Sequence, residues 1–192
     1  MISVDGFPAP ATFAEACRLE ASVCLASTLT DTGLLPASLD RPLKLPTLQA
    51  GEACPVTHSA EVATLDSFLI PRPGPGPVYP DGAVAMQGVA VLGHGGSVNG
   101  WANFKTLWFS RPSYQGPWVI RGKQLDGPSP VIFGERPTVS ELVVPAGPTV
   151  NETNDGYREA PGGTYIRGPG CYAEQVDGLS FSYVIVFQVV SG

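Results

Sequence analysis

Glycine and proline are the residues that most restrict how this chain can fold. The sequence contains 23 glycines and 20 prolines, about a fifth of its 192 residues. Proline fixes its own φ angle and lacks a backbone N–H, and glycine weakens the interior of helices and strands, so this composition excludes long helices and requires many turns. Asp-Gly dipeptides, which suit tight turns, begin at Asp5, Asp81, Asp126, Asp155 and Asp177.

Short apolar runs lie between these turn residues and predict strands rather than helices. No helical pattern of crossover length separates the runs, which argues against a parallel α/β fold. Eight short strands with turn signals about every ten residues are typical of a sandwich or barrel. We therefore expect an all-β fold, an antiparallel β-sandwich of immunoglobulin-like or jelly-roll-like type. The predicted strands lie near residues 84–92, 101–109, 117–124, 129–134, 139–145, 163–168, 171–176 and 180–190.

The first residues differ from the rest and predict an N-terminal extension. Thr12-Phe-Ala-Glu15 is a capping box, and good helix formers follow it to about Ala26. Cys17 and Cys24 would lie about 10 Å apart on such a helix, too far for a bond between them. We divide the chain into an extension, 1–38, with a short helix, and a β-sandwich domain, 39–192. Residues 39–46 are expected to be extended chain lying across a surface.

Charge and hydropathy narrow the classes of partner. Charged residues make up 15% of the chain, below the roughly 25% of an average domain. The net charge of −6 argues against nucleic acid, because phosphate binding needs clustered lysine and arginine. No apolar stretch approaches the roughly 18 residues of a membrane-spanning helix, and no signal peptide is visible. Low charge with abundant glycine and proline is usual for secreted β domains.

The candidate catalytic residues are few. His94 lies in a glycine-rich loop near Ser97, so a hydrolase using His94 with Ser97 or with an acid such as Asp126 is an alternative function. Cys54 and His58 are a weaker nucleophile–base pair. The sequence lacks the Gly-x-Ser-x-Gly nucleophile elbow. We therefore favour a non-catalytic protein over an enzyme, and we expect no cofactor.

Metal binding is also a minor alternative. The cysteines and histidines show neither CxxC nor HxxxH spacing, which makes a zinc site improbable. The segment Asn151–Asp155 is rich in side-chain oxygens and could be a calcium loop, although a solvated turn is the commoner reading. We expect no metal.

Aromatic residues are the best binding signal. Exposed aromatic rings stack on sugars or anchor protein partners, and Trp101, Tyr114 and Trp118 are the candidate contact residues. The alternative is that most of the aromatic residues fill the core. Trp101 and Trp108 are an odd number of residues apart, so on one strand they would point to opposite faces.

Charged residues inside the predicted strands have a structural and a functional reading. Arg121 and Lys123 would share one face of a strand, opposite Ile120. The structural reading is a solvated face, or an ion pair with Asp177 or Glu174. The functional reading is a basic spot for an acidic ligand.

Several motifs together resemble a family of uncharacterised bacterial secreted or lipoprotein-like β domains, mostly from high-GC bacteria. The resemblance covers roughly residues 39 to 190. It implies an exported protein and a disulfide between Cys54 and Cys171, but it supplies no catalytic residues. The motifs are Arg41–Pro46, Cys54–Thr57, Gly76–Pro80, Trp101 with Lys105 and Trp108, Tyr114–Pro117, Ile120–Gly122, Leu125–Gly127, Phe133–Gly134, Gly170–Ala173, Gln175–Gly178, Phe181–Ser182 and Val184–Phe187.

The sequence therefore predicts an extracellular or cell-surface protein. Its expected function is that of a non-catalytic binding or structural module for a cell-surface glycan or a protein partner. The alternatives are the hydrolase described above and a subunit of a surface or particle assembly, which a strand-rich surface of low charge would favour. The oligomeric state stays open.

Overall fold

The computed structural model describes residues 37–65, 68–82, 88–93, 95–147, 151–152 and 156–192. Within these ranges the chain forms thirteen β-strands and no helix, so the part described has no apolar helix of membrane-spanning length. The all-β prediction is confirmed for this part. The helix predicted from Thr12 to about Ala26, with Cys17 and Cys24, lies outside the described residues.

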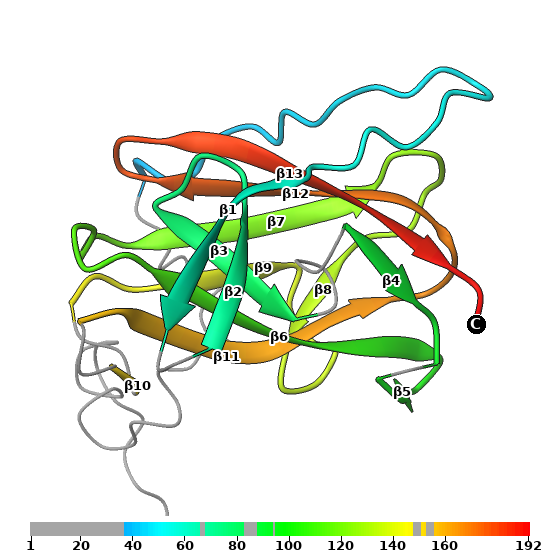
Figure 1. Ribbon diagram of the computed structural model, residues 1–192. Coiled ribbons are helices and arrows are strands. Elements are labelled where there is room, and N and C mark those ends of the chain that lie inside the picture. The colour runs from blue at the N-terminus through cyan, green and yellow to red at the C-terminus, as the bar shows by residue number, and fades with distance from the viewer. Residues whose placement is uncertain (1–36, 66–67, 83–87, 94, 148–150, 153–155) are drawn as a thin grey trace, which may run out of the picture.

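The strands form two sheets that face each other and one separate hairpin (Figure 1). Every strand pairing in the two large sheets is antiparallel except that of β13 with β4, which is parallel. The first sheet contains β10 (Asn151–Glu152), β11 (Arg158–Ile166), β6 (Trp101–Ser110), β3 (Val78–Gly82), β5 (Ser97–Val98) and β8 (Ile132–Gly134). The second contains β4 (Val89–Val91), β13 (Ser182–Val190), β12 (Gly170–Gly178), β7 (Trp118–Gln124) and β9 (Glu141–Val144), and the hairpin contains β1 (Ser59–Leu65) and β2 (Phe68–Pro73).

The prediction of a wholly antiparallel sandwich is therefore corrected to one antiparallel sheet and one mixed sheet. The parallel pair arises because residues 88–91 run along the free edge of β13, and the Gln188 amide donates to the Gly88 carbonyl oxygen at 2.8 Å. The sequence also makes a single strand plausible over residues 61–70, and this prediction is wrong. Leu65 pairs with Phe68, so the chain reverses there and makes the β1–β2 hairpin.

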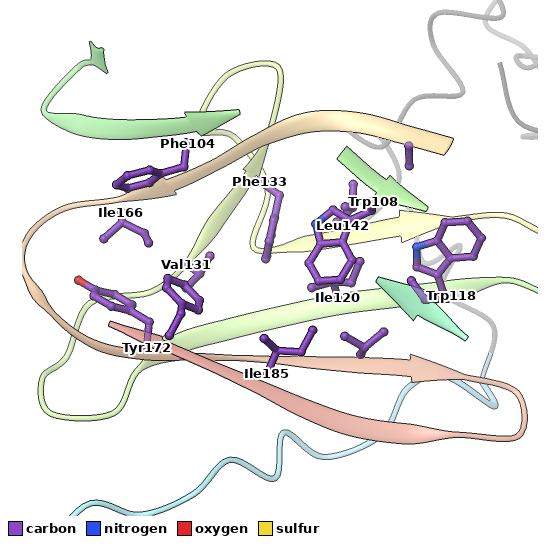
Figure 2. Packing of buried hydrophobic residues seen from close by; sticks show 14 of the residues in the cluster. Phe104, Trp108, Trp118, Ile120, Val131, Phe133, Leu142, Ile166, Tyr172 and Ile185 are labelled. Carbon is purple, nitrogen blue, oxygen red and sulfur yellow. The ribbon is translucent and has the colours of Figure 1, made fainter. Parts of the chain in front are cut away.

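The hydrophobic core lies between the two sheets, as period-two alternation requires. Figure 2 shows the side chains of Phe104 and Trp108 from β6 directed toward Tyr172 and Ile120 of the opposite sheet. Phe133 from β8 stands between the layers. These side chains are almost fully buried, so most of the tryptophan and tyrosine content is core, as one reading of the sequence held.

An extended segment, residues 39–57, covers the outer face of the second sheet, and we call it the strap (Figure 1). Leu39 packs on Val119 and Val143 at one end of the strap. At the other end, a disulfide joins Cys54 to Cys171 with a Cα–Cα distance of 5.4 Å. The expectation of extended chain across a surface is confirmed, and so is the disulfide that the family resemblance implied.

The strap completes a layer that β-strands alone leave open. Leu45 and Leu48 pack on the outer side chains of β12 and β13. The Thr57 amide then donates to the Val186 carbonyl oxygen at 2.8 Å and occupies part of the β13 edge. The second sheet is therefore covered on both faces, with the core on one side and the strap on the other.

Candidate functional site

Trp101 is a predicted contact residue that is partly exposed and whose ring lies against a cationic group. It begins β6 and points away from the core, because Ala102 and Phe104 pack inward. The Arg167 guanidinium carbon lies 4.5 Å from the centre of the Trp101 ring. A guanidinium at this distance over an indole is a cation–π contact. The odd-spacing argument is confirmed, since Trp108 is buried and Trp101 is partly exposed.

Arg167 reaches Trp101 because of the sheet register. Ala102 pairs with Ile166, the last residue of β11, so the next residue of that strand extends beside Trp101. Asn103 and Lys105 follow Trp101 on the same outer face, and Lys105 is exposed. Trp101, Asn103, Lys105 and Arg167 are called the Trp101 face. The sequence alone did not indicate Arg167, because it stands in a turn and only register brings it here.

Tyr114 lies at the other end of the molecule and has a structural role. Nine residue steps of β6 separate Trp101 from Ser110, which is about 30 Å at the rise of a strand. The Tyr114 hydroxyl donates to the Pro117 carbonyl oxygen at 2.6 Å and accepts from the Leu179 amide at 3.0 Å. Tyr114 therefore ties two turns together, and it does not share a surface with Trp101.

Trp118 is corrected from a contact residue to a core residue. Its side chain is 0% exposed, so no ligand can reach its ring. The guanidinium of Arg158 lies 4.6 Å from the ring centre, and Arg158 is itself buried. Its two terminal nitrogens donate to the Gly116 and Pro145 carbonyl oxygens. This packed arrangement closes one end of the sandwich.

The candidate hydrolase residues are only partly described. His94 lies outside the described residues, while Ser97 is an exposed residue of β5. The Asp126 carboxylate accepts from the Cys171 amide at 3.0 Å, which fixes the turn after β7. Cys54 has no thiol to serve as a nucleophile, because it is bonded to Cys171. The use of His94 as a base stays a prediction.

No group of three or more histidine, cysteine, aspartate or glutamate side chains in the described part of the chain is placed to hold a metal ion. Of the proposed calcium loop, Asn151 and Glu152 form β10, and residues 153–155 lie outside the described ranges. Calcium binding at that loop stays a prediction.

Arg121 makes the ion pair that its position in the strand predicts. Its guanidinium lies 2.8 Å from the buried Asp177 carboxylate, on the outer face of the second sheet. The Gln175 side-chain nitrogen donates to the same carboxylate oxygen at 2.8 Å. The Gln175 side-chain oxygen accepts from the Lys44 backbone amide at 2.6 Å. Arg121 is therefore part of the surface of the second sheet on which the strap packs. Its position does not require a basic site for an acidic ligand.

Glu174, the other partner considered for Arg121, points the opposite way. It lies between Tyr172 and Val176 on the core face of β12 and is 0% exposed. Neither carboxyl oxygen has a hydrogen-bond partner among the described residues. Burial raises the pKa of Glu174 to about 8, because the charged form loses its hydration. A buried acid of this kind is unusual, and the sequence pattern alone did not separate it from a surface glutamate.

These residues define a class of structure: a disulfide-stapled β-sandwich with a strap over one sheet and the Trp101 face on the other. The sequence matches no protein-family model and no curated protein. Among solved structures, a putative lipoprotein from Bacillus anthracis is similar with a TM-score of 0.41 and 13% identity, over 73% of this chain and 89% of that chain. This similarity is too distant to assign a function.

Proposed function

We propose that the protein is an extracytoplasmic, non-catalytic binding module that uses the Trp101 face to bind a cell-surface glycan. The observation that carries the proposal is the partly exposed Trp101 ring with the Arg167 guanidinium 4.5 Å from its centre. Aromatic rings offer a flat apolar surface to the C–H face of a sugar. Arginine adds a rigid fork of N–H donors for hydroxyl or carboxylate oxygens.

The disulfide supports the location. Bonds such as Cys54–Cys171 form and persist in oxidising compartments and are rare in the cytosol. This bond also holds a segment of irregular chain, the strap, on a surface that would otherwise be apolar and uncovered. An oxidising compartment is therefore the environment in which this sandwich is most stable.

The remainder of the Trp101 face fits a polar ligand with an apolar side. Lys105 is exposed on the strand that carries Trp101, and Asn103 lies between them. The neighbouring strand β11 has no side chain at Gly163, where a Cβ would lie 2.6 Å from the Asn103 side-chain oxygen Oδ1. The face therefore combines one aromatic ring, two cationic groups and an amide on rigid strand and turn positions.

The test is binding of the purified, oxidised protein to a panel of cell-surface glycans, followed by titration calorimetry with the best ligand. Trp101→Ala should weaken binding by roughly tenfold or more, and Arg167→Ala by less. Leu179→Ala is the matched control, because Leu179 is 51% exposed at the opposite end of the sandwich. Unchanged affinity in folded Trp101→Ala protein would refute the proposal.

A further inference from the structure

Arg167 is an exposed cation that the fold holds in a fixed place. Its backbone stands at the start of the turn between β11 and β12. The buried Tyr172 hydroxyl donates to the Gly168 carbonyl oxygen of that turn at 2.9 Å, and the Arg167 guanidinium carbon lies 4.5 Å from the centre of the Trp101 ring. Both ends of the Arg167 side chain are therefore positioned in advance, which lowers the entropy that a ligand must offset on binding.

The N–H donors of Arg167 remain open to a ligand. A cation–π contact uses the charge of the guanidinium, whereas the five donors lie in the plane of the group. Among the described residues, no carboxylate lies within ion-pair distance of Arg167 and no hydrogen bond links its guanidinium to an acceptor. A planar fork of donors matches the two oxygens of a carboxylate. Arg167 is therefore suited to a bidentate pair with a carboxylate of the ligand.

Lys105 is a second cation on the same face. β6 and β11 run side by side (Figure 1), and Lys105 lies opposite Gly163. Trp101 and Lys105 are four residues apart on β6, so both point outward and their Cα atoms lie about 13 Å apart. Lys105 is exposed and has no carboxylate within ion-pair distance in the part of the chain that the structure describes. This spacing exceeds the width of one sugar ring, so a ligand that reaches both cations is an oligosaccharide.

The positive charge of this face is local. The chain as a whole carries a net charge of −6. Glu135 stands beside the face, since its carbonyl oxygen accepts from the Tyr165 hydroxyl at 2.6 Å. Burial raises the pKa of Tyr165, the Glu135 charge adds to this rise, and the Arg136 charge opposes it. The charges of Glu135 and Arg136 therefore act in opposite directions here, and the two cations of the Trp101 face set its sign.

We propose that the ligand of the Trp101 face is an acidic oligosaccharide whose sugars carry carboxylate groups, as uronic acids do. This inference rests on the glycan-binding function proposed above and names the class of glycan. Arg167 pairs with one carboxylate through two N–H donors, and the exposed part of the Trp101 ring contacts the apolar C–H side of that sugar. Lys105 binds a carboxylate further along the oligosaccharide. A neutral glycan would leave both cations without a counter-charge.

The first experiment compares acidic oligosaccharides with neutral counterparts by titration calorimetry on the oxidised protein. The probes are tetramers of galacturonic, glucuronic and mannuronic acid, each paired with the tetramer whose carboxyl groups are reduced to alcohols. At least one acidic tetramer should bind roughly tenfold or more tightly than its neutral counterpart. High salt should remove most of this difference, because it screens exposed charges. Equal affinity within every pair would overturn the inference.

The outcomes separate this inference from the proposed function. If neutral tetramers bind as tightly as acidic ones and folded Trp101→Ala protein loses both, the face binds glycans without selecting acids, and only the inference fails. If no tetramer of either kind binds, the inference fails, and the wider panel of glycans decides the proposed function.

The second experiment assigns the carboxylate contacts to side chains. Arg167→Lys keeps the positive charge but loses the planar fork, so the affinity for the preferred acidic tetramer should fall roughly tenfold. Lys105→Gln should lower the same affinity roughly threefold, as expected for an exposed ion pair. Lys123→Gln is the matched control, because Lys123 is an exposed lysine of β7 on the other sheet and the variant makes the same charge change.

Two results would contradict the assignment of these contacts. If Arg167→Lys binds the acidic tetramer as tightly as the wild type, the fork of donors is not used. If Lys123→Gln lowers the affinity as much as Lys105→Gln, the attraction comes from the net charge of the protein and not from the Trp101 face. Either result would overturn the inference.

Discussion

Glu174 should make this protein lose stability as the pH rises through the neutral range, against the usual behaviour of a carboxylate. Burial raises its pKa from 4.5 to about 8 in the folded state. Between these values the folded state holds a proton that the unfolded state has released. The contribution of Glu174 to the free energy of unfolding is therefore largest below about pH 4.5 and falls progressively until the pH passes about 8.

The magnitude follows from the shift. One pKa unit corresponds to about 1.4 kcal/mol, so the slope approaches that value per pH unit within the window. At pH 7 the cost of keeping Glu174 protonated is on the order of 3 kcal/mol. Glu174→Gln has no ionisable group at this position. The difference between its free energy of unfolding and that of the wild type should therefore rise, in favour of the variant, by up to about 1.4 kcal/mol per pH unit between pH 5 and 8.

Urea denaturation at each pH, followed by tryptophan fluorescence, measures both proteins, since Trp108 and Trp118 are buried and report unfolding. Glu135→Gln makes the same charge change at an exposed position in the turn after β8 and serves as the control. Its profile should run parallel to that of the wild type. If Glu174→Gln and the wild type keep a constant difference from pH 5 to 8, the reasoning from desolvation is refuted.

Further predictions concern the strap. Replacing Cys54 and Cys171 by serine should cost about 4–5 kcal/mol in the chain-entropy model, because the bond closes a loop with a sequence separation of 117; an unchanged urea midpoint would contradict this. Asp177→Asn should cost roughly 2–4 kcal/mol, since it removes the buried charge that pairs with Arg121. The Arg41 guanidinium lies 3.8 Å from the same carboxylate and is partly exposed, so Arg41→Ala should cost less than about 1 kcal/mol by urea denaturation. If Arg41→Ala cost more than Asp177→Asn, the Arg121–Asp177 ion pair would not be what anchors the strap.

The sequence was most informative where one side of a strand differs from the other. Odd spacing predicted that Trp101 and Trp108 point to opposite faces, and alternation placed Arg121 on the face where it meets Asp177. The antiparallel hairpin of β12 and β13 also follows from a long apolar run after Asp177-Gly178. In these cases local geometry determines the outcome, and no distant segment alters it.

The sequence was least informative where distant segments decide the environment. The run Trp118-Val-Ile120 is apolar without interruption because the strap covers Val119 while the core covers its neighbours, so no alternation shows which face Trp118 takes. Arg167 reaches Trp101 only through the pairing of β11 with β6. The Cys54–Cys171 pair came from a resemblance, since four cysteines permit three pairings.

The strap has a consequence for the order in which the chain can fold. The strap packs on β12 and β13. It is synthesised well before these strands, because Cys54 and Cys171 are 117 residues apart in the sequence. During translation its leucines therefore emerge with nothing to cover, and closing so long a loop is slow. The strap can therefore pack on the outer face of β12 and β13 only after those last strands have been synthesised.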